Sequence, residues 1–149
     1  MKFKTKANEE GWAMNSTLEW FIEKRILYWH TPEILTMQHV VDLNEDAWHR
    51  LDQGTPLVHF IINTEGTKKF PVSVAQFRSA SKILAHPNLG WVIIVSDNSV
   101  INFVASVVTQ IVTKVRYRSV RSVEDALQFL QGQDQSINWE NSDEQVLVP

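Results

Sequence analysis

The feature that most constrains the fold is a long apolar stretch, WVIIVSDNSVINFVASVVTQIV, at residues 91–112. The polar segment Ser96–Ser99 interrupts it, and burying such groups in hydrocarbon costs several kcal/mol. Neither half of the stretch reaches the roughly 20 apolar residues that a membrane-spanning helix needs. The stretch therefore predicts a buried strand over 91–95, a turn, and a helix from about residue 99 to residue 113.

The rest of the chain alternates between strand-like and helix-like patterns. Runs of aromatic and β-branched residues on either side of Lys24 and Arg25 predict a hairpin over 17–31. Within it, alternation places three apolar side chains on one face of the first strand: Leu18, Trp20 and Ile22. The spacing of apolar residues and the capping residues predict the remaining elements, which are helices over 37–52, 73–84 and 122–132 and strands over 56–62 and 115–120.

This order of elements indicates an α/β fold. Strands that alternate with helices favour a mixed, mostly parallel sheet flanked by helices, and here an antiparallel hairpin opens it. The length of 149 residues suits a single domain. We expect that domain over 17–131, between a flexible N-terminal segment, 1–16, and an acidic tail, 132–149. The tail contains no Lys or Arg, so we expect it to be flexible or loosely docked, with Trp139 as a candidate anchor.

Composition excludes several classes of function. The chain has no cysteine, which excludes disulfides and thiolate catalysis, and a net charge of -3 does not favour nucleic-acid binding. No apolar segment follows the N-terminal lysines as in a secretory signal, so we expect a cytoplasmic protein. The five histidines lack the spacing of paired metal ligands. We therefore expect no metal, no cofactor and no enzymatic activity.

The chain resembles the STAS-like (anti-sigma-factor-antagonist-like) domains over residues 17–131. The likeness lies in the order of elements and in SVAQFRSASKILAHPNLGWVIIVSDNSVINFVASVVTQI, residues 73–111, followed by YRSVRSVEDALQFL, residues 117–130. The resemblance implies a non-enzymatic binding module, in which phosphorylation of a hydroxyl after the central strand switches partner binding. That family's loop is Asp-Ser-Ser-Gly-like, whereas this chain has Asn63-Thr64-Glu65-Gly66. Thr64 and Ser73 are the hydroxyls that could serve such a switch, and both also suit ordinary turn and cap roles.

The same loops suggest a ligand site. Ligands of α/β sheets bind beyond the carboxyl ends of the parallel strands. The candidate regulatory or ligand residues there are Asn63, Thr64, Gly66, Ser73, Ser96 and Asp97. A small-ligand-binding or enzymatic domain that uses these loops is accordingly the alternative to a protein-interaction module.

The helix predicted after residue 99 suggests an interface. No charged residue lies between Asp97 and Lys114, and the apolar arc is wider than one sheet face covers. We expect a second chain, in a homodimer, or the tail to cover the outer part of this arc. The interface residues we expect are Val100, Phe103, Val104, Val107, Val108 and Ile111.

The strand predicted over 115–120 carries a basic ridge. It consists of Lys114, Arg116, Arg118 and Arg121. Such a ridge suits either a solvated edge or a partner for the acidic tail. From the sequence we thus expect a non-enzymatic, self-associating protein-interaction or regulatory module that binds neither nucleic acid nor membrane.

Overall fold

A five-stranded mixed sheet forms the centre of the molecule. The computed structural model describes residues 17–111 and 115–148, so the N-terminal segment expected to be flexible and Lys114 lie outside the described residues. The strands are β1 (Thr17–Ile22), β2 (Ile26–His30), β3 (Val58–Asn63), β4 (Leu89–Val95) and β5 (Arg116–Val120). They lie in the order β1-β2-β3-β4-β5, with β1 antiparallel to β2 and all other pairs parallel. The predicted α/β fold class is confirmed.

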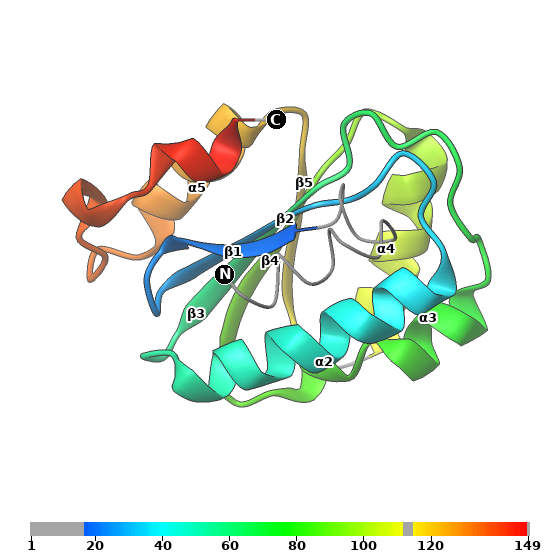
Figure 1. Ribbon diagram of the computed structural model, residues 1–149, viewed down its shortest axis with the longest axis horizontal. Helices are drawn as coiled ribbons and strands as arrows, with labels where there is room; N and C mark the ends of the chain where they lie inside the picture. Colours follow the sequence, from blue (N-terminus) through cyan, green and yellow to red (C-terminus); the bar gives the residue numbers. More distant parts are fainter. Residues whose placement is uncertain (1–16, 112–114, 149) are drawn as a thin grey trace, which may run out of the picture.

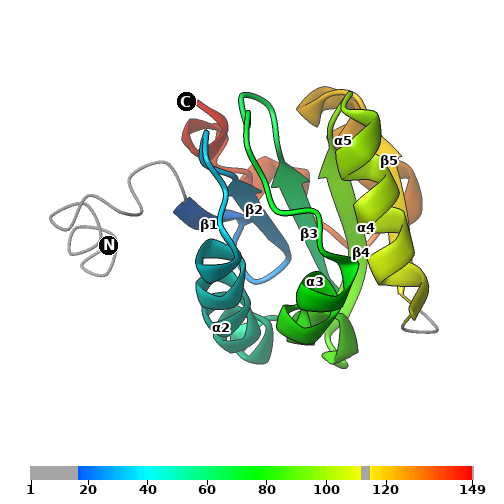
Figure 2. The same ribbon diagram turned by 90° about the vertical axis from the view of Figure 1, so that its right-hand side faces the viewer.

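Helices cover both faces of this sheet (Figure 1). One face carries α2 (Met37–Gln53), α3 (Val74–Ala80), the 3-10 helix η1 (Lys82–Ala85) and α4 (Ser99–Ile111), as Figure 2 shows. The other face carries α5 (Val123–Gln133) and two short 3-10 helices, η2 (Trp139–Asn141) and η3 (Glu144–Leu147). None of the helices in the described ranges combines the length and the apolar character that crossing a membrane requires.

Side-chain caps explain where the helices begin. The Asn98 Oδ1 atom accepts hydrogen bonds from the backbone N–H groups of Val100 (2.8 Å) and Ile101 (3.2 Å) at the start of α4. The Ser122 hydroxyl caps α5 in the same way by accepting from Asp125 N–H at 3.0 Å. These bonds satisfy donors that have no partner within the helix, so the polar break at 96–99 fixes the start of α4 as predicted.

The sheet separates two apolar cores. Phe60 and Val92 belong to the core under α2, α3 and α4, and Ile61 and Ile93 belong to the core under α5. Because successive side chains of a strand point to opposite faces, the buried strands β3 and β4 contribute to both cores.

One predicted face assignment is wrong at the end of β1. Leu18 and Trp20 pack in the core under α2, but Ile22 packs with Phe21 in the core under α5. The register of β1 against β2 shifts between Trp20 and Ile22, which is a β-bulge or a related irregularity. An irregularity of this kind moves the following side chain to the other face.

The acidic tail packs against the sheet instead of extending freely. Ile137 is only 7% exposed, and Trp139 packs against the same core, in agreement with its expected role as an anchor. The Asp143 N–H group donates to the Phe21 carbonyl at 2.8 Å, beside the bridge between Ile22 and Ser142. Composition suggested a loosely held segment, yet four of its apolar residues pack on the second face: Ile137, Trp139, Val146 and Leu147.

The tail of this chain also lies away from the basic ridge. It reaches β1, at one edge of the sheet, whereas Arg116 and Arg118 are exposed on β5, at the opposite edge. The Arg118 guanidinium lies 4.6 Å from the centre of the Phe129 ring of α5. The prediction that the tail of the same chain docks on the ridge is therefore wrong, and Arg116 and Arg118 form a solvated edge of the sheet.

Candidate ligand-binding site

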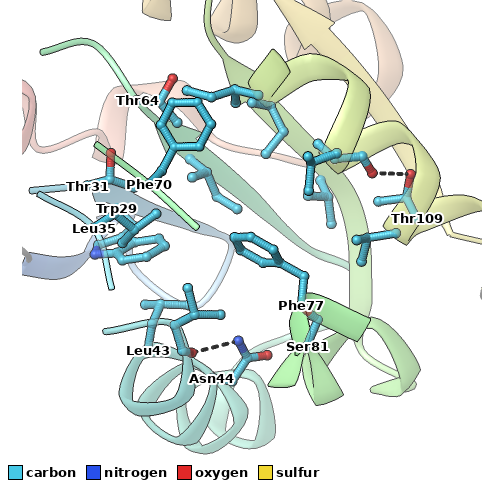
Figure 3. A pocket seen from close by; sticks show the side chains of 18 of the residues that line it. Trp29, Thr31, Leu35, Leu43, Asn44, Thr64, Phe70, Phe77, Ser81 and Thr109 are labelled. Carbon is cyan, nitrogen blue, oxygen red and sulfur yellow. Dashed lines mark hydrogen bonds between the residues drawn. The ribbon is translucent and has the colours of Figure 1, made fainter. Parts of the chain in front are cut away.

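A cavity of about 140 Å³ lies between the sheet and the helices α2, α3 and α4. Figure 3 shows it from close by, with the rings of Trp29, Phe70 and Phe77 directed into the same space. Phe60 and Ile94 line it from β3 and β4 of the sheet. The space therefore adjoins the apolar core of this face, is partly open to solvent, and is not filled by side chains.

The elements of this face explain why the space is unfilled. The helix α2 is long and well anchored, with Leu43 and Leu51 among its buried residues. The helix α3 lies against both α2 and α4, has only seven residues, and buries none of them fully. Because a short helix supplies few large side chains, the region between α2 and α4 is covered but incompletely packed.

Three threonines line the cavity near the carboxyl ends of β2 and β3. The Thr64 hydroxyl donates to the Val95 carbonyl at 2.7 Å, and the Thr67 hydroxyl donates to the Pro32 carbonyl at 2.7 Å. The Thr31 hydroxyl lies 3.3 Å from the Asn63 carbonyl, to which it donates, and also lies against the Thr67 hydroxyl. Their donor hydrogens are thus directed at the protein itself.

Two further polar side chains of the lining are bonded within the protein. Asn44 is buried in α2, where its Nδ2 donates to the Val40 carbonyl (2.9 Å) and its Oδ1 accepts from Ile83 N–H (3.1 Å). The Thr109 hydroxyl lies 2.9 Å from the Ala105 carbonyl of its own helix. Ser81 is the one lining hydroxyl in the described residues for which the structure shows no hydrogen bond, and it is half-buried.

Of the residues predicted for the ligand loop, only Thr64 lines the cavity. Its neighbour Asn63 is buried on the opposite side, where its Nδ2 donates to the Tyr28 hydroxyl at 2.8 Å and its Oδ1 accepts from Glu65 N–H. Alternation along the end of β3 separates the two residues. Burial raises the pKa of Tyr28 above its ordinary value, the hydrogen bond from Asn63 partly offsets this, and the Glu65 carboxylate adds a smaller upward effect.

Three of the other four predicted loop residues have turn and cap roles. Gly66 has a φ of +88°, the left-handed conformation that favours glycine, and Ser73 caps α3 by accepting from Gln76 N–H at 3.2 Å. Ser96 is buried and accepts from Asn98 N–H at 2.9 Å, and Asp97 is exposed. The phosphorylation of Thr64 or Ser73 stays a prediction.

The predicted interface residues of α4 divide between the two sides of the helix. Val104 and Val108 are buried and line the cavity, so they belong to the core of this chain. Val100 and Phe103 are 47% and 64% exposed, while Val107 is half-buried. The side chain of Ile111 lies outside the described part of the structure.

A polar cluster lies near the other end of the fold. Buried His59 of β3 accepts from Trp91 N–H through Nδ1 (2.9 Å), and its Nε2 lies 2.8 Å from Asp134 Oδ2. Arg25 binds the same carboxylate oxygen at 2.9 Å and also donates to the Leu57 carbonyl. Burial lowers the pKa of His59, although the hydrogen bond to Asp134 opposes this.

The carboxylate of that cluster is strongly stabilised in its charged form. Burial would raise the pKa of Asp134, but hydrogen bonds from Ser136 and His59 outweigh that effect and lower the pKa to about 2. The cluster joins the start of the tail to β3. In the described ranges, no group of three or more His, Cys, Asp or Glu residues is arranged to hold a metal ion.

Sequence reasoning missed the cavity itself. The available signal was the group of aromatic residues around α3, Phe70 and Phe77, in a segment whose helix is short. Comparisons with protein-family models, with curated proteins and with solved structures found no match for this chain. The resemblance to STAS-like domains therefore stays a prediction.

Proposed function

We propose that this chain is a non-enzymatic binding module whose cavity holds a small apolar ligand. The observation that carries the proposal is the cavity of about 140 Å³ in the core between α2, α3 and α4. Protein interiors are normally packed to the density of organic crystals, so a domain contains few spaces of this size, and an apolar space with a few polar groups is a usual site for a ligand.

The chemistry of the lining favours binding over catalysis. Its described residues include no Asp, Glu, His, Lys, Arg or Tyr, the side chains that usually serve as general acids and bases. The cavity also lies near the strand ends, where α/β sheets commonly bind ligands, and Thr64 belongs to its lining. The resemblance to STAS-like domains agrees with a binding module that has no reaction of its own.

Thermal unfolding of the full chain with toluene as probe tests this proposal. A ligand at ten times its Kd stabilises the folded state by about 1.4 kcal/mol, which raises the Tm by roughly 3–6 °C for a chain of this size. Ala105→Leu adds carbon atoms to a residue of the lining and should abolish the rise. Gln110→Leu, on an exposed position of the same helix that does not line the cavity, should preserve it. An unchanged Tm for the wild type, or an equal rise for Ala105→Leu, would refute the function.

Self-association through α4 is a second candidate function. It is favoured by Val100 and Phe103, which are exposed one turn apart on a helix that carries no charged residue. A stable dimer buries roughly 800 Å² on each partner, so these two residues would form the centre of a larger contact between two copies of the chain.

Light scattering after size-exclusion chromatography measures the mass of the protein in solution and so tests for self-association directly. The wild type should elute with the mass of a dimer, and Phe103→Gln should shift it toward the 17.2 kDa of one chain. Val148→Gln changes an equally exposed residue of the tail and should leave the mass unchanged. A monomeric wild type would eliminate this candidate and leave the ligand proposal standing.

A further inference from the structure

We infer that the ligand is an uncharged hydrocarbon or hydrocarbon-like molecule of about six or seven carbon atoms, held without a hydrogen bond. This inference rests on the proposed function and names its ligand class. The size follows from the volume, because an apolar cavity of about 150 Å³ accommodates benzene. The cavity here, about 140 Å³, has room for one small ring or a short branched chain.

The absence of a charge partner excludes ionic ligands. The described lining contains no Lys, Arg or His to pair with a carboxylate or phosphate, and no Asp or Glu to pair with an amine. Moving an unpaired ion into such a space would cost far more than the apolar contacts return. Acids, amines and phosphate esters are therefore disfavoured.

The hydrogen bonds within the lining disfavour neutral polar ligands as well. The hydroxyls of Thr31, Thr64 and Thr67 donate to backbone carbonyls, so a ligand would have to displace one of these bonds to receive a donor. Asn44 and Thr109 are bonded to their own surroundings in the same way. A ligand carbonyl or amide oxygen would consequently find no free donor among these side chains, and a ligand hydroxyl could donate only to a hydroxyl oxygen that already takes part in a hydrogen bond, which weakens binding.

Ser81 is the lining residue that is best able to form a hydrogen bond with a polar ligand. Its hydroxyl has no hydrogen bond in the structure and follows the end of α3. Because Ser81 is half-buried, its hydroxyl has access to water and is not an unsatisfied buried group. A hydrocarbon ligand should thus bind equally well when this hydroxyl is removed.

Three probes of similar size and different polarity test the inference: toluene, phenol and benzoate. The full chain, labelled with ¹³C at its methyl groups, is titrated with each probe, and the Kd is read from the shifts of Leu43, Val104 and Val108. We expect toluene to bind, phenol to bind at least about tenfold more weakly, and benzoate to leave the spectrum unchanged. Ser81→Ala should change the Kd for toluene by less than about twofold.

The outcomes separate the inference from the proposed function. Phenol or benzoate binding as tightly as toluene would overturn the hydrocarbon assignment, and loss of that binding in Ser81→Ala would identify the polar contact. The binding function itself would survive that result. If no probe shifts these methyl groups, or if Ala105→Leu still binds toluene with the wild-type Kd, the proposed function fails together with the inference.

Discussion

A single buried histidine joins parts of the chain that are far apart in sequence. His59 accepts a hydrogen bond from Trp91 N–H through Nδ1, so its proton lies on Nε2, which donates to Asp134. Both ring nitrogens are therefore used in the neutral form, and protonation of Nδ1 would remove the acceptor for Trp91. The charged groups that act on the ring are Asp134, Arg25 and Arg116, of which only the carboxylate favours protonation.

This arrangement predicts a loss of stability at mildly acidic pH. The folded-state pKa of His59 lies below the ordinary 6.5, so below pH 6.5 the unfolded chain takes up a proton that the folded chain does not. As the pH decreases below 6.5, the free energy of unfolding should decrease by up to about 1.4 kcal/mol for each pH unit. Urea unfolding between pH 7.5 and pH 5 checks this effect. The Asp134 carboxylate does not interfere, because its contribution to stability is lost only as the pH falls from 3.8, its ordinary pKa, toward its folded-state pKa of about 2.

The matched variant for that experiment is His59→Asn. It keeps an acceptor near Trp91 N–H but has no group that titrates in this range. Its free energy of unfolding should be lower than that of the wild type at pH 7.5 and should depend less on pH. Parallel pH profiles for the two proteins would show that His59 does not control the acid response.

Close packing around the same ring leaves no room for a side chain at Gly90. A Cβ atom at position 90 would lie 2.5 Å from His59 Nδ1 and 3.1 Å from Leu57 Cβ. Gly90→Ala should therefore destabilise the fold by roughly 1–3 kcal/mol in urea unfolding. Gly132→Ala is the control: it lies in α5 with open space around it and should stabilise by up to about 1 kcal/mol. Equal effects of the two substitutions would contradict this packing.

At the scale of elements, most helices and strands followed from local patterns, whereas the bulge, the tail and the division of the helix predicted over 73–84 into α3 and η1 did not. The start of α4 was predicted correctly from the polar break at 96–99, because the capping of a helix depends on a few neighbouring residues. The face of Ile22 depends on how β1 pairs with β2, which no local pattern encodes. The docking of Ile137 depends on a surface built by distant residues such as Phe21. The cavity likewise arises from how side-chain shapes fit together between α2, α3 and α4.

The docked tail predicts a clear contrast between two of its apolar residues, Ile137 and Val148. Ile137→Ala removes atoms from the core under α5 and should cost about 2–4 kcal/mol of unfolding free energy. Val148→Ala, at a position 63% exposed, should stay within about 0.5 kcal/mol of the wild type. Urea unfolding of both variants at pH 7.5 makes the comparison, and a negligible effect of Ile137→Ala would mean that the tail does not pack on the sheet.

At the scale of the whole molecule, the two faces of the sheet differ in how they are filled. On one face, α5 and the tail pack together around Ile137, and His59, Asp134 and Arg25 fix the start of the tail. On the other face, the separate helices α2, α3, η1 and α4 cover the sheet, and a cavity lies between α2, α3 and α4. The first face is therefore the more completely packed, and the second is the one on which we propose that a ligand binds.

The most direct test of the binding account is a crystal structure of the full chain under xenon pressure. Xenon enters apolar cavities large enough to hold it and is recognised by its strong scattering. We expect xenon between Phe60, Phe77 and Val108, with no ordered water beside it. A collapsed space, or ordered water molecules bonded to the threonines of the lining, would contradict the claim that this protein holds a small apolar ligand.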